Sequence, residues 1–147
     1  MNEKDLRRLL ASGSEKESLE FKSASKDYSI LGGHKKDKGS LYGYCVGIGN
    51  SGGGKIIFGI SDDHKIVGTK SFAKPEEVKS QIYKRLNSKI SIHEIETEEG
   101  RVVVVDVPPR QKGRYFDFHG IPLTRVGEEL IEMNQDEIRQ ILQESIE

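Results

Sequence analysis

The sequence predicts a single α+β domain in which a mixed β-sheet packs with about four helices. The chain has 147 residues, a length typical of one domain, and 34% of them are hydrophobic. Short β-branched runs follow one another with helical segments interspersed, an order typical of α+β proteins. Residues 1–147 are therefore assigned to one domain, since no linker or repeat divides the chain.

Four segments show the apolar spacing or the capping residues of helices. Asn2 can cap a first helix that ends at Gly13, with Asp5 as its partner in a capping box. Gly43 and Gly47 disfavour the second helical segment, but they would let another backbone approach it closely. Further helices are expected over residues 41–48, 75–86 and 135–145.

Alternating or continuous apolar runs predict the strands. Residues 19–22 alternate, so Glu20 should face away from Leu19 and Phe21. Residues 101–107 are the richest in β-branched side chains and are expected to form a central strand that two prolines end. The other strands are expected over residues 55–61, 65–69, 90–95, 114–118 and 123–126.

The net charge of −1 conceals three blocks of opposite sign. Residues 21–42 hold five lysines against two aspartates, and residues 101–114 hold four basic residues against one aspartate. Residues 128–147 hold seven carboxylates against one arginine. Such blocks can direct a polyanion to one face, although solvated loops and helix faces show the same pattern. A uniformly basic protein is excluded, so a nucleic acid would bind only to a local patch.

Membrane insertion and disulfide bonding are not expected. No apolar run approaches the roughly 18 residues of a membrane span, and no signal peptide is recognised. Cys45 is the single cysteine, so it forms neither an intrachain disulfide nor a thiolate metal site alone. The four histidines lack the spacing of a zinc site. These features predict a protein of the cytoplasm.

A glycine-rich segment raises the question of phosphate binding. Residues 49–55 fit the pattern G-x-x-x-x-G-K, but Ile56 stands where a phosphate loop has Ser or Thr for magnesium. The order of elements is also reversed, because a helix precedes the segment and a strand follows it. The pattern thus argues against nucleotide hydrolysis. It leaves open a backbone nest with Lys55 for a phosphate, or a tight helix-to-strand turn.

Carboxylates beside two strands are the candidates for metal chemistry. Glu15 and Glu20 precede and enter the first strand, and Asp62 follows the strand expected over residues 55–61. If these strands are close, the carboxylates converge and offer the hard oxygen ligands that Mg²⁺ or Mn²⁺ prefers. A bound ion could activate water for attack on a phosphodiester. Aspartates in such positions also serve simply as turn residues.

Four motifs in register resemble the Schlafen AlbA-like family, also described as divergent AAA or DNA-binding domains. The first helix leads into LEFK, and the middle of the chain reads YCVGIGNSGGGKIIFGISDD. The closing pieces are VDVPPR and LTRVGEELIEMNQDEI, so the motifs cover almost the whole chain. The run Val46-Gly47-Ile48 replaces the alanine-phenylalanine-alanine common in the family, and the lysine-rich loop is longer than usual.

The resemblance implies an α+β fold that binds nucleic acid. Schlafen-type nucleases carry an acidic triad, which maps onto Glu15, Glu20 and Asp62, with Asp63 as an alternative third member. These residues are accordingly the expected catalytic groups and the expected ligands of Mg²⁺ or Mn²⁺. The animal nucleases enclose RNA between two lobes, whereas this chain supplies one. A homodimer is therefore implied for an active nuclease.

We therefore expect a domain that binds DNA or RNA, with a metal-dependent endoribonuclease site as the finer prediction. The alternatives are an ATP-binding regulator and a non-catalytic interaction module whose acidic last helix docks a partner. Aromatic residues near the basic segments would either stack on bases or belong to the core. The expected phosphate contacts are Lys22, Lys35, Lys36, Lys38, Lys55, Arg110, Lys112, Arg114 and Arg125.

Overall fold

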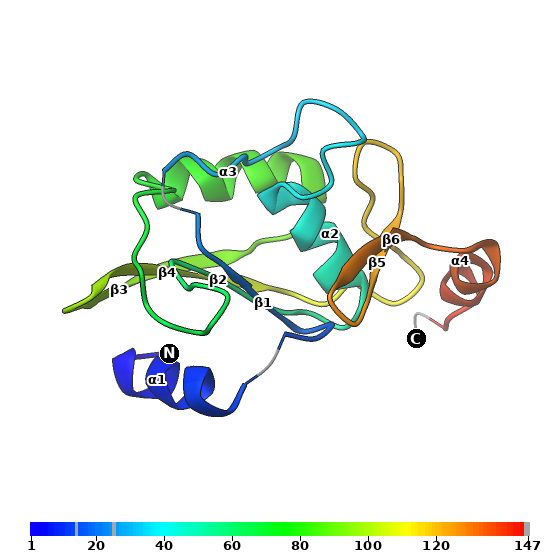
Figure 1. Ribbon diagram of the computed structural model, residues 1–147. Helices are drawn as coiled ribbons and strands as arrows, with labels where there is room; N and C mark the ends of the chain where they lie inside the picture. The colour runs from blue at the N-terminus through cyan, green and yellow to red at the C-terminus, as the bar shows by residue number, and fades with distance from the viewer. Residues whose placement is uncertain (14, 25, 146–147) are drawn as a thin grey trace.

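A four-stranded mixed sheet is the centre of the structure (Figure 1). The computed structural model describes residues 1–13, 15–24 and 26–145. Its helices are α1 (Glu3–Ser12), α2 (Leu41–Asn50), α3 (Pro75–Leu86) and α4 (Gln135–Leu142). Its strands are β1 (Leu19–Lys22), β2 (Gly54–Phe58), β3 (Ser91–Thr97), β4 (Gly100–Val107), β5 (Leu123–Val126) and β6 (Glu129–Glu132).

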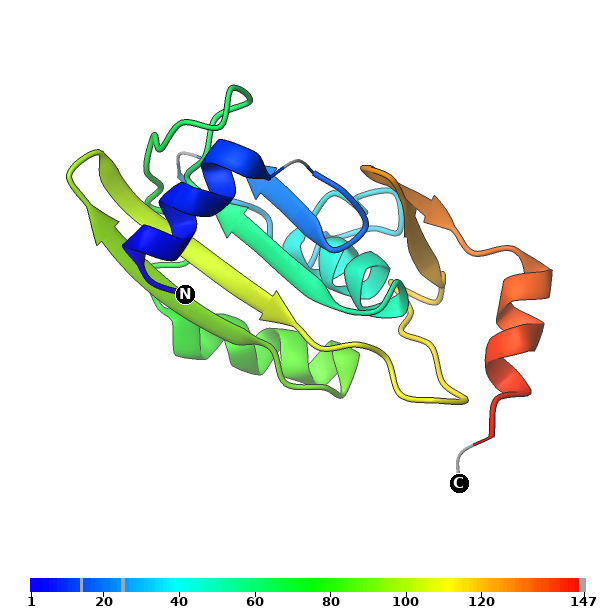
Figure 2. The ribbon, with the colours of Figure 1, turned by 90° about the horizontal axis from the view of Figure 1, so that it is seen from below.

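The strands of the central sheet run in the order β1-β2-β4-β3, and β5 and β6 form a separate hairpin. β1 and β2 are parallel, so the chain crosses over between them through a long loop and α2. β4 lies between β2 and β3 and is antiparallel to both. α2 and α3 cover one face of the sheet, and α1 covers the other (Figures 1 and 2). The predicted α+β class with a mixed sheet is confirmed.

Both faces of the central sheet are buried, and the sequence of β4 reflects this. Val103 and Val105 belong to the core under α2 and α3, whereas Val102 and Val104 belong to the core under α1. A continuous run of valines therefore fills two cores at once, as expected for a strand covered on both sides. Burying one such side chain fully contributes roughly 1.5–3 kcal/mol to stability.

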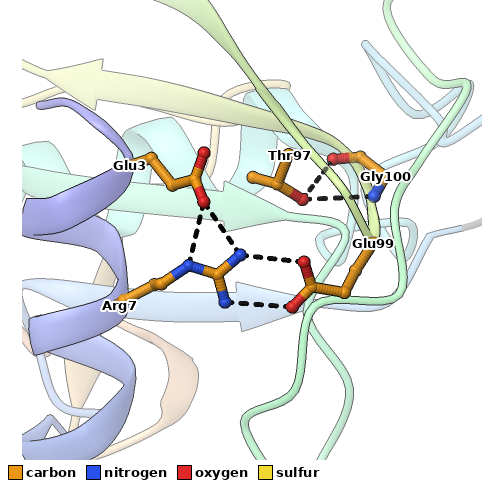
Figure 3. Close-up of polar contacts among 5 residues, drawn as sticks. All are labelled: Glu3, Arg7, Thr97, Glu99 and Gly100. Atoms are coloured by element: carbon orange, nitrogen blue, oxygen red, sulfur yellow. Dashed lines mark hydrogen bonds and ion pairs between the residues drawn. The ribbon is translucent and has the colours of Figure 1, made fainter.

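An exposed network of ion pairs holds α1 against the turn between β3 and β4 (Figure 3). Arg7 donates to both carboxylate oxygens of Glu99, at 2.9 and 2.8 Å, and to Glu3 at 3.0 Å. The Thr97 hydroxyl closes the turn by donating to the Gly100 carbonyl at 2.8 Å and accepting from its N–H at 3.1 Å. Because solvent reaches these ions, the apolar side of α1 supplies most of the docking energy.

Two strands expected from the sequence are not formed. Residues 65–69 contribute an isolated antiparallel bridge between Ile66 and Ile60 and no strand, since Gly68, at φ 80°, turns the chain against the start of β4. Residues 114–118 are held instead by the side chain of Asn50. Its amide accepts from the Phe116 N–H at 2.8 Å and donates to the Phe116 carbonyl at 2.9 Å, as a neighbouring strand would.

The four predicted helices are present in the described residues. α1 begins with the predicted capping box of Asn2 and Asp5, and α4 ends at Leu142 rather than at residue 145. β5 is predicted by the sequence but β6 is not, because Leu130 and Ile131 are adjacent and give no alternation. None of the helices in the described part of the chain has the length and apolar character needed to cross a membrane.

Close approaches by other segments explain the glycines of α2. A Cβ on Gly47 would collide with the side chain of Leu130 in β6. A Cβ on Gly43 would lie 2.6 Å from the carbonyl carbon of Lys38, in the loop that precedes the helix. This loop therefore packs on the start of α2 only because residue 43 has no side chain, which confirms the close approach expected from the sequence.

Gly43→Ala should therefore destabilise the protein. The collision with the Lys38 backbone cannot be relieved by a change of rotamer, and overpacking of this kind costs about 1–3 kcal/mol. Gly39→Ala is the matched control, because a Cβ there meets no atom within 4 Å. Chemical denaturation should show a lower free energy of unfolding for Gly43→Ala alone. Equal stability of the two variants would contradict the close packing.

Candidate functional site

Glu20 and Arg125 form an ion pair inside the protein. Glu20 lies in β1 and is 4% exposed, and Arg125 lies in β5 and is 2% exposed. A guanidinium nitrogen of Arg125 donates to a carboxylate oxygen of Glu20. Leu19 and Phe21 face the core under α1, so Glu20 points to the opposite face, as the sequence predicts. The pair ties the β5–β6 hairpin to the edge of the central sheet.

Lys22 and Tyr44 extend this pair toward solvent. The Lys22 ammonium lies 3.5 Å from a Glu20 carboxylate oxygen and 4.6 Å from the centre of the Tyr44 ring. The guanidinium carbon of Arg125 lies 5.7 Å from the centre of the same ring. Both distances are within the range of cation–π attraction. The Lys22 side chain is 28% exposed, so it is the basic member of this cluster that solvent reaches.

Burial and pairing oppose each other in the electrostatics of this cluster. Burial raises the pKa of Glu20 above its ordinary value, while Arg125 and Lys22 act to lower it. Burial lowers the pKa of Lys22, but Tyr44 and Glu20 outweigh it, so this pKa is raised. Among the described residues, Nε and Nη1 of Arg125 have no hydrogen-bond partner although they are buried. The cluster thus contains more hydrogen-bond donors than the Glu20 carboxylate binds.

The other two predicted metal ligands do not join Glu20 in one group. Glu15 is near enough to add to the effect of burial in raising the pKa of Glu20, and its carboxylate accepts from the Phe21 N–H at 3.2 Å. Asp62 is exposed in the turn after β2. Within the described ranges, no three His, Cys, Asp or Glu side chains come together to hold a metal ion. Glu20 is paired with Arg125 and Lys22 in this arrangement, so its carboxylate would bind Mg²⁺ or Mn²⁺ only after those pairs open.

Two basic loops meet beside α2 (Figure 1). The first basic loop (residues 26–40) precedes α2, and the second basic loop (residues 108–122) connects β4 to β5. His119 Nε2 of the second loop lies 2.8 Å from the carbonyl oxygen of Gly32 in the first. The predicted phosphate contacts that are exposed on these two loops are Lys35, Lys36, Lys38, Lys112 and Arg114.

Four predicted phosphate contacts are already paired with carboxylates, and the pair of Lys22 with Glu20 is described above. Arg110 donates to both carboxylate oxygens of Glu144, at 2.6 and 2.9 Å. Lys55 pairs with Asp106 on the face of the sheet that α1 covers, away from the two basic loops. Arg125 is internal, and a phosphate contact by it would require its pair with Glu20 to open. The two basic loops therefore carry most of the predicted contacts that solvent reaches.

The glycine-rich segment forms a tight turn between α2 and β2. Gly52 and Gly53 have φ values of 106° and 86°, which let the chain reverse there. A Cβ on Gly53 would lie 2.9 Å from the backbone nitrogen of Pro109. Of the two interpretations of this segment, a tight helix-to-strand turn accounts for the geometry. Binding of ATP stays a prediction.

Asn50 and His119 are the residues of this region that the sequence analysis missed. Asn50 bonds Phe116, as described above, and also donates to the Leu123 carbonyl at 2.7 Å, so it aligns the second basic loop with β5. A signal for Asn50 exists, because a polar residue that ends an uncharged, buried helix usually has hydrogen-bond partners. No comparable signal exists for His119, whose partner lies 87 residues away.

The chain belongs to the Schlafen, AlbA_2 family. The model of this family matches residues 15–134, which include Glu20, Arg125 and both basic loops. The resemblance carried by the four sequence motifs is therefore confirmed. No curated protein is similar enough to this chain to count as a match.

Among the solved structures that resemble this one, two illustrate the match. The crystal structure of the DIP2311 protein from Corynebacterium diphtheriae shares the fold, with a TM-score of 0.66 and 16% identity. The match covers 93% of this chain but only 30% of that one. The solution structure of the N-terminal domain of a protein related to the ATP-dependent DNA helicase RecG, from Nitrosomonas europaea, matches at a TM-score of 0.49 and 19% identity. That match covers 88% of this chain and 89% of the domain.

Removing one partner of the buried pair should destabilise the protein strongly. Glu20→Ala leaves the Arg125 guanidinium buried and unpaired, and a change of this kind costs about 3–5 kcal/mol. The double variant Glu20→Leu with Arg125→Met removes both charges and should recover most of that loss. Urea denaturation of the wild type, Glu20→Ala and the double variant measures the effect. A double variant less stable than Glu20→Ala would show that the pair is not what holds these two side chains in place.

Proposed function

We propose that this domain binds nucleic acid through its phosphates, on the side where the two basic loops meet. The observation that carries the proposal is the contact between His119 and Gly32, which joins two basic segments far apart in the sequence. Lysine and arginine side chains from both loops are exposed there. Contacts of such side chains with phosphates supply most of the sequence-independent affinity for nucleic acids.

The family and the distribution of charge support the same proposal. The Schlafen, AlbA_2 model covers both loops, and the resemblance to this family implies nucleic-acid binding. The near-neutral net charge is no objection, because residues 128–147 hold seven carboxylates against one arginine, and basic residues exceed acidic ones in the rest of the chain. A polyanion is therefore attracted by one part of the surface and repelled by another, which favours a single orientation of the bound strand.

Replacing Lys35, Lys36 and Lys38 by Ala together should weaken binding to a short DNA duplex and to a single-stranded RNA. Titrations at salt concentrations between about 50 and 200 mM measure the effect. For the duplex, the slope of log affinity against log salt should become shallower by about 2 to 3, since each phosphate contact contributes about 0.9. Comparison of the two probes then shows whether DNA or RNA is preferred.

A control with the same change of charge is available on the other side of the molecule. Lys4, Arg8 and Lys65 are exposed on or beside α1. Their joint replacement by Ala should leave both the affinity and the salt slope nearly unchanged. Equal losses in the two triple variants would overturn the proposal, because binding would then follow net charge and not the two basic loops.

Metal-dependent cleavage at Glu15, Glu20 and Asp62 is the finer proposal. The closeness of Glu15 to Glu20 supports it, but Glu20 would have to leave its basic partners. Glu15→Gln and Asp62→Asn should each abolish Mn²⁺-dependent cleavage of RNA, while Glu17→Gln, which is exposed in the same segment, should keep it. Chelation should stop cleavage by the wild type. Cleavage that survives in Glu15→Gln and Asp62→Asn would contradict these roles.

A further inference from the structure

A group of hydrogen-bond donors encloses the Glu144 carboxylate at the second basic loop. Arg110 donates to both of its oxygens, as described above, and the backbone N–H of Gly113 donates to one of them at 3.0 Å. Arg110 also donates to the carbonyls of Gln111 and Arg114, at 3.3 and 3.5 Å, which brace its side chain within the loop. A braced guanidinium fork and a loop amide together form a receptor for one anionic group.

The receptor borders a cavity with further positive charge. This cavity, of about 130 Å³, lies between the end of α3 and the second basic loop, and Arg110 forms part of its wall. Arg85 and Arg114 line it as well, against a single carboxylate, that of Asp117. Among the residues that the structure describes, the Glu144 carboxylate accepts from Arg110 and Gly113, so Arg85 and Arg114 add positive charge to the cavity that this carboxylate does not use.

The helix α4, which ends two residues before Glu144, has few other contacts with the rest of the molecule. Ile141 is its one buried residue among those described, and Leu142 is 58% exposed. α4 lies at the periphery of the molecule, away from the central sheet (Figures 1 and 2). Arg110 and the Gly113 amide lower the pKa of Glu144 to about 2, and Glu137 is also attracted to Arg110. Beside the burial of Ile141, the pair of Glu144 with Arg110 therefore attaches this end of the chain to the second basic loop.

We propose that Arg110, the Gly113 amide and the adjoining arginines form a subsite for a phosphate group, and that Glu144 occupies it until a phosphate displaces α4. A guanidinium group donates the same two parallel hydrogen bonds to a carboxylate or to a phosphate. Arg85 and Arg114 line the adjoining cavity and add to the positive potential that attracts a phosphate. The ligand is taken to be a backbone phosphodiester, and this part of the inference rests on the proposed binding of nucleic acid.

Glu144→Gln should raise the affinity for the short DNA duplex or the RNA about three- to tenfold, because the internal carboxylate no longer competes for the subsite. Glu132→Gln removes the same charge from an exposed position of β6 and should change the affinity much less. Adding Arg110→Gln to Glu144→Gln should abolish the gain. Equal gains in Glu144→Gln and Glu132→Gln would overturn the subsite, since the effect would then be one of net charge.

A second measurement does not depend on nucleic acid. Inorganic phosphate is titrated into the wild type and into Glu144→Gln at constant ionic strength, and the NMR shift of the Gly113 amide is followed. The amide should respond at lower phosphate concentration in Glu144→Gln. A response to phosphate without any binding of oligonucleotides would overturn the proposed function and retain the subsite for a small phosphate. Oligonucleotide binding with no response of Gly113 in either protein would retain the function and overturn the subsite.

Discussion

The buried ion pair between Glu20 and Arg125 is the interaction on which the rest of the site depends. Its partners are 105 residues apart in the sequence, one in the first strand and one in the β5–β6 hairpin. Removing two charges from water is unfavourable, and their attraction offsets this only when both stay in place. The ion pair therefore fixes the position of the β5–β6 hairpin against β1, at the edge of the central sheet. Lys22 contacts the same carboxylate, and the Tyr44 ring lies against the cations of Lys22 and Arg125.

The fold class, the helices and the central strand could be predicted because their signals are local. Apolar spacing defines the run of β4, and Asn2 marks the start of α1. Of the two expected strands that are not formed, residues 114–118 are bonded to Asn50 across 66 residues, and no local pattern encodes that contact. The same limit applies to the site. Glu20 and Arg125 could each be selected from the sequence as candidate functional residues. Their pairing could not be predicted, because the sequence does not show whether a charged side chain is solvated or paired with an opposite charge.

Carboxylates of this chain already neutralise several of its basic groups. Glu144 pairs with Arg110 and Asp106 with Lys55, and these contacts lie on different sides of the molecule. The nearly balanced net charge is thus partly the sum of internal pairs, while Lys35, Lys36, Lys38, Lys112 and Arg114 of the two basic loops are exposed. A ligand with phosphates competes with the protein's own acids wherever it meets a paired arginine, and with water elsewhere.

The parallel pairing of β1 with β2 has a consequence for folding and for ligand-linked stability. A parallel neighbour cannot be reached by a tight turn, so the pairing of β1 with β2 closes a crossover that contains the first basic loop and α2. The loop and the edge strand therefore form one cooperative unit. A ligand that orders the loop would also slow local opening of β1, and hydrogen exchange in that strand would report on binding at a distance.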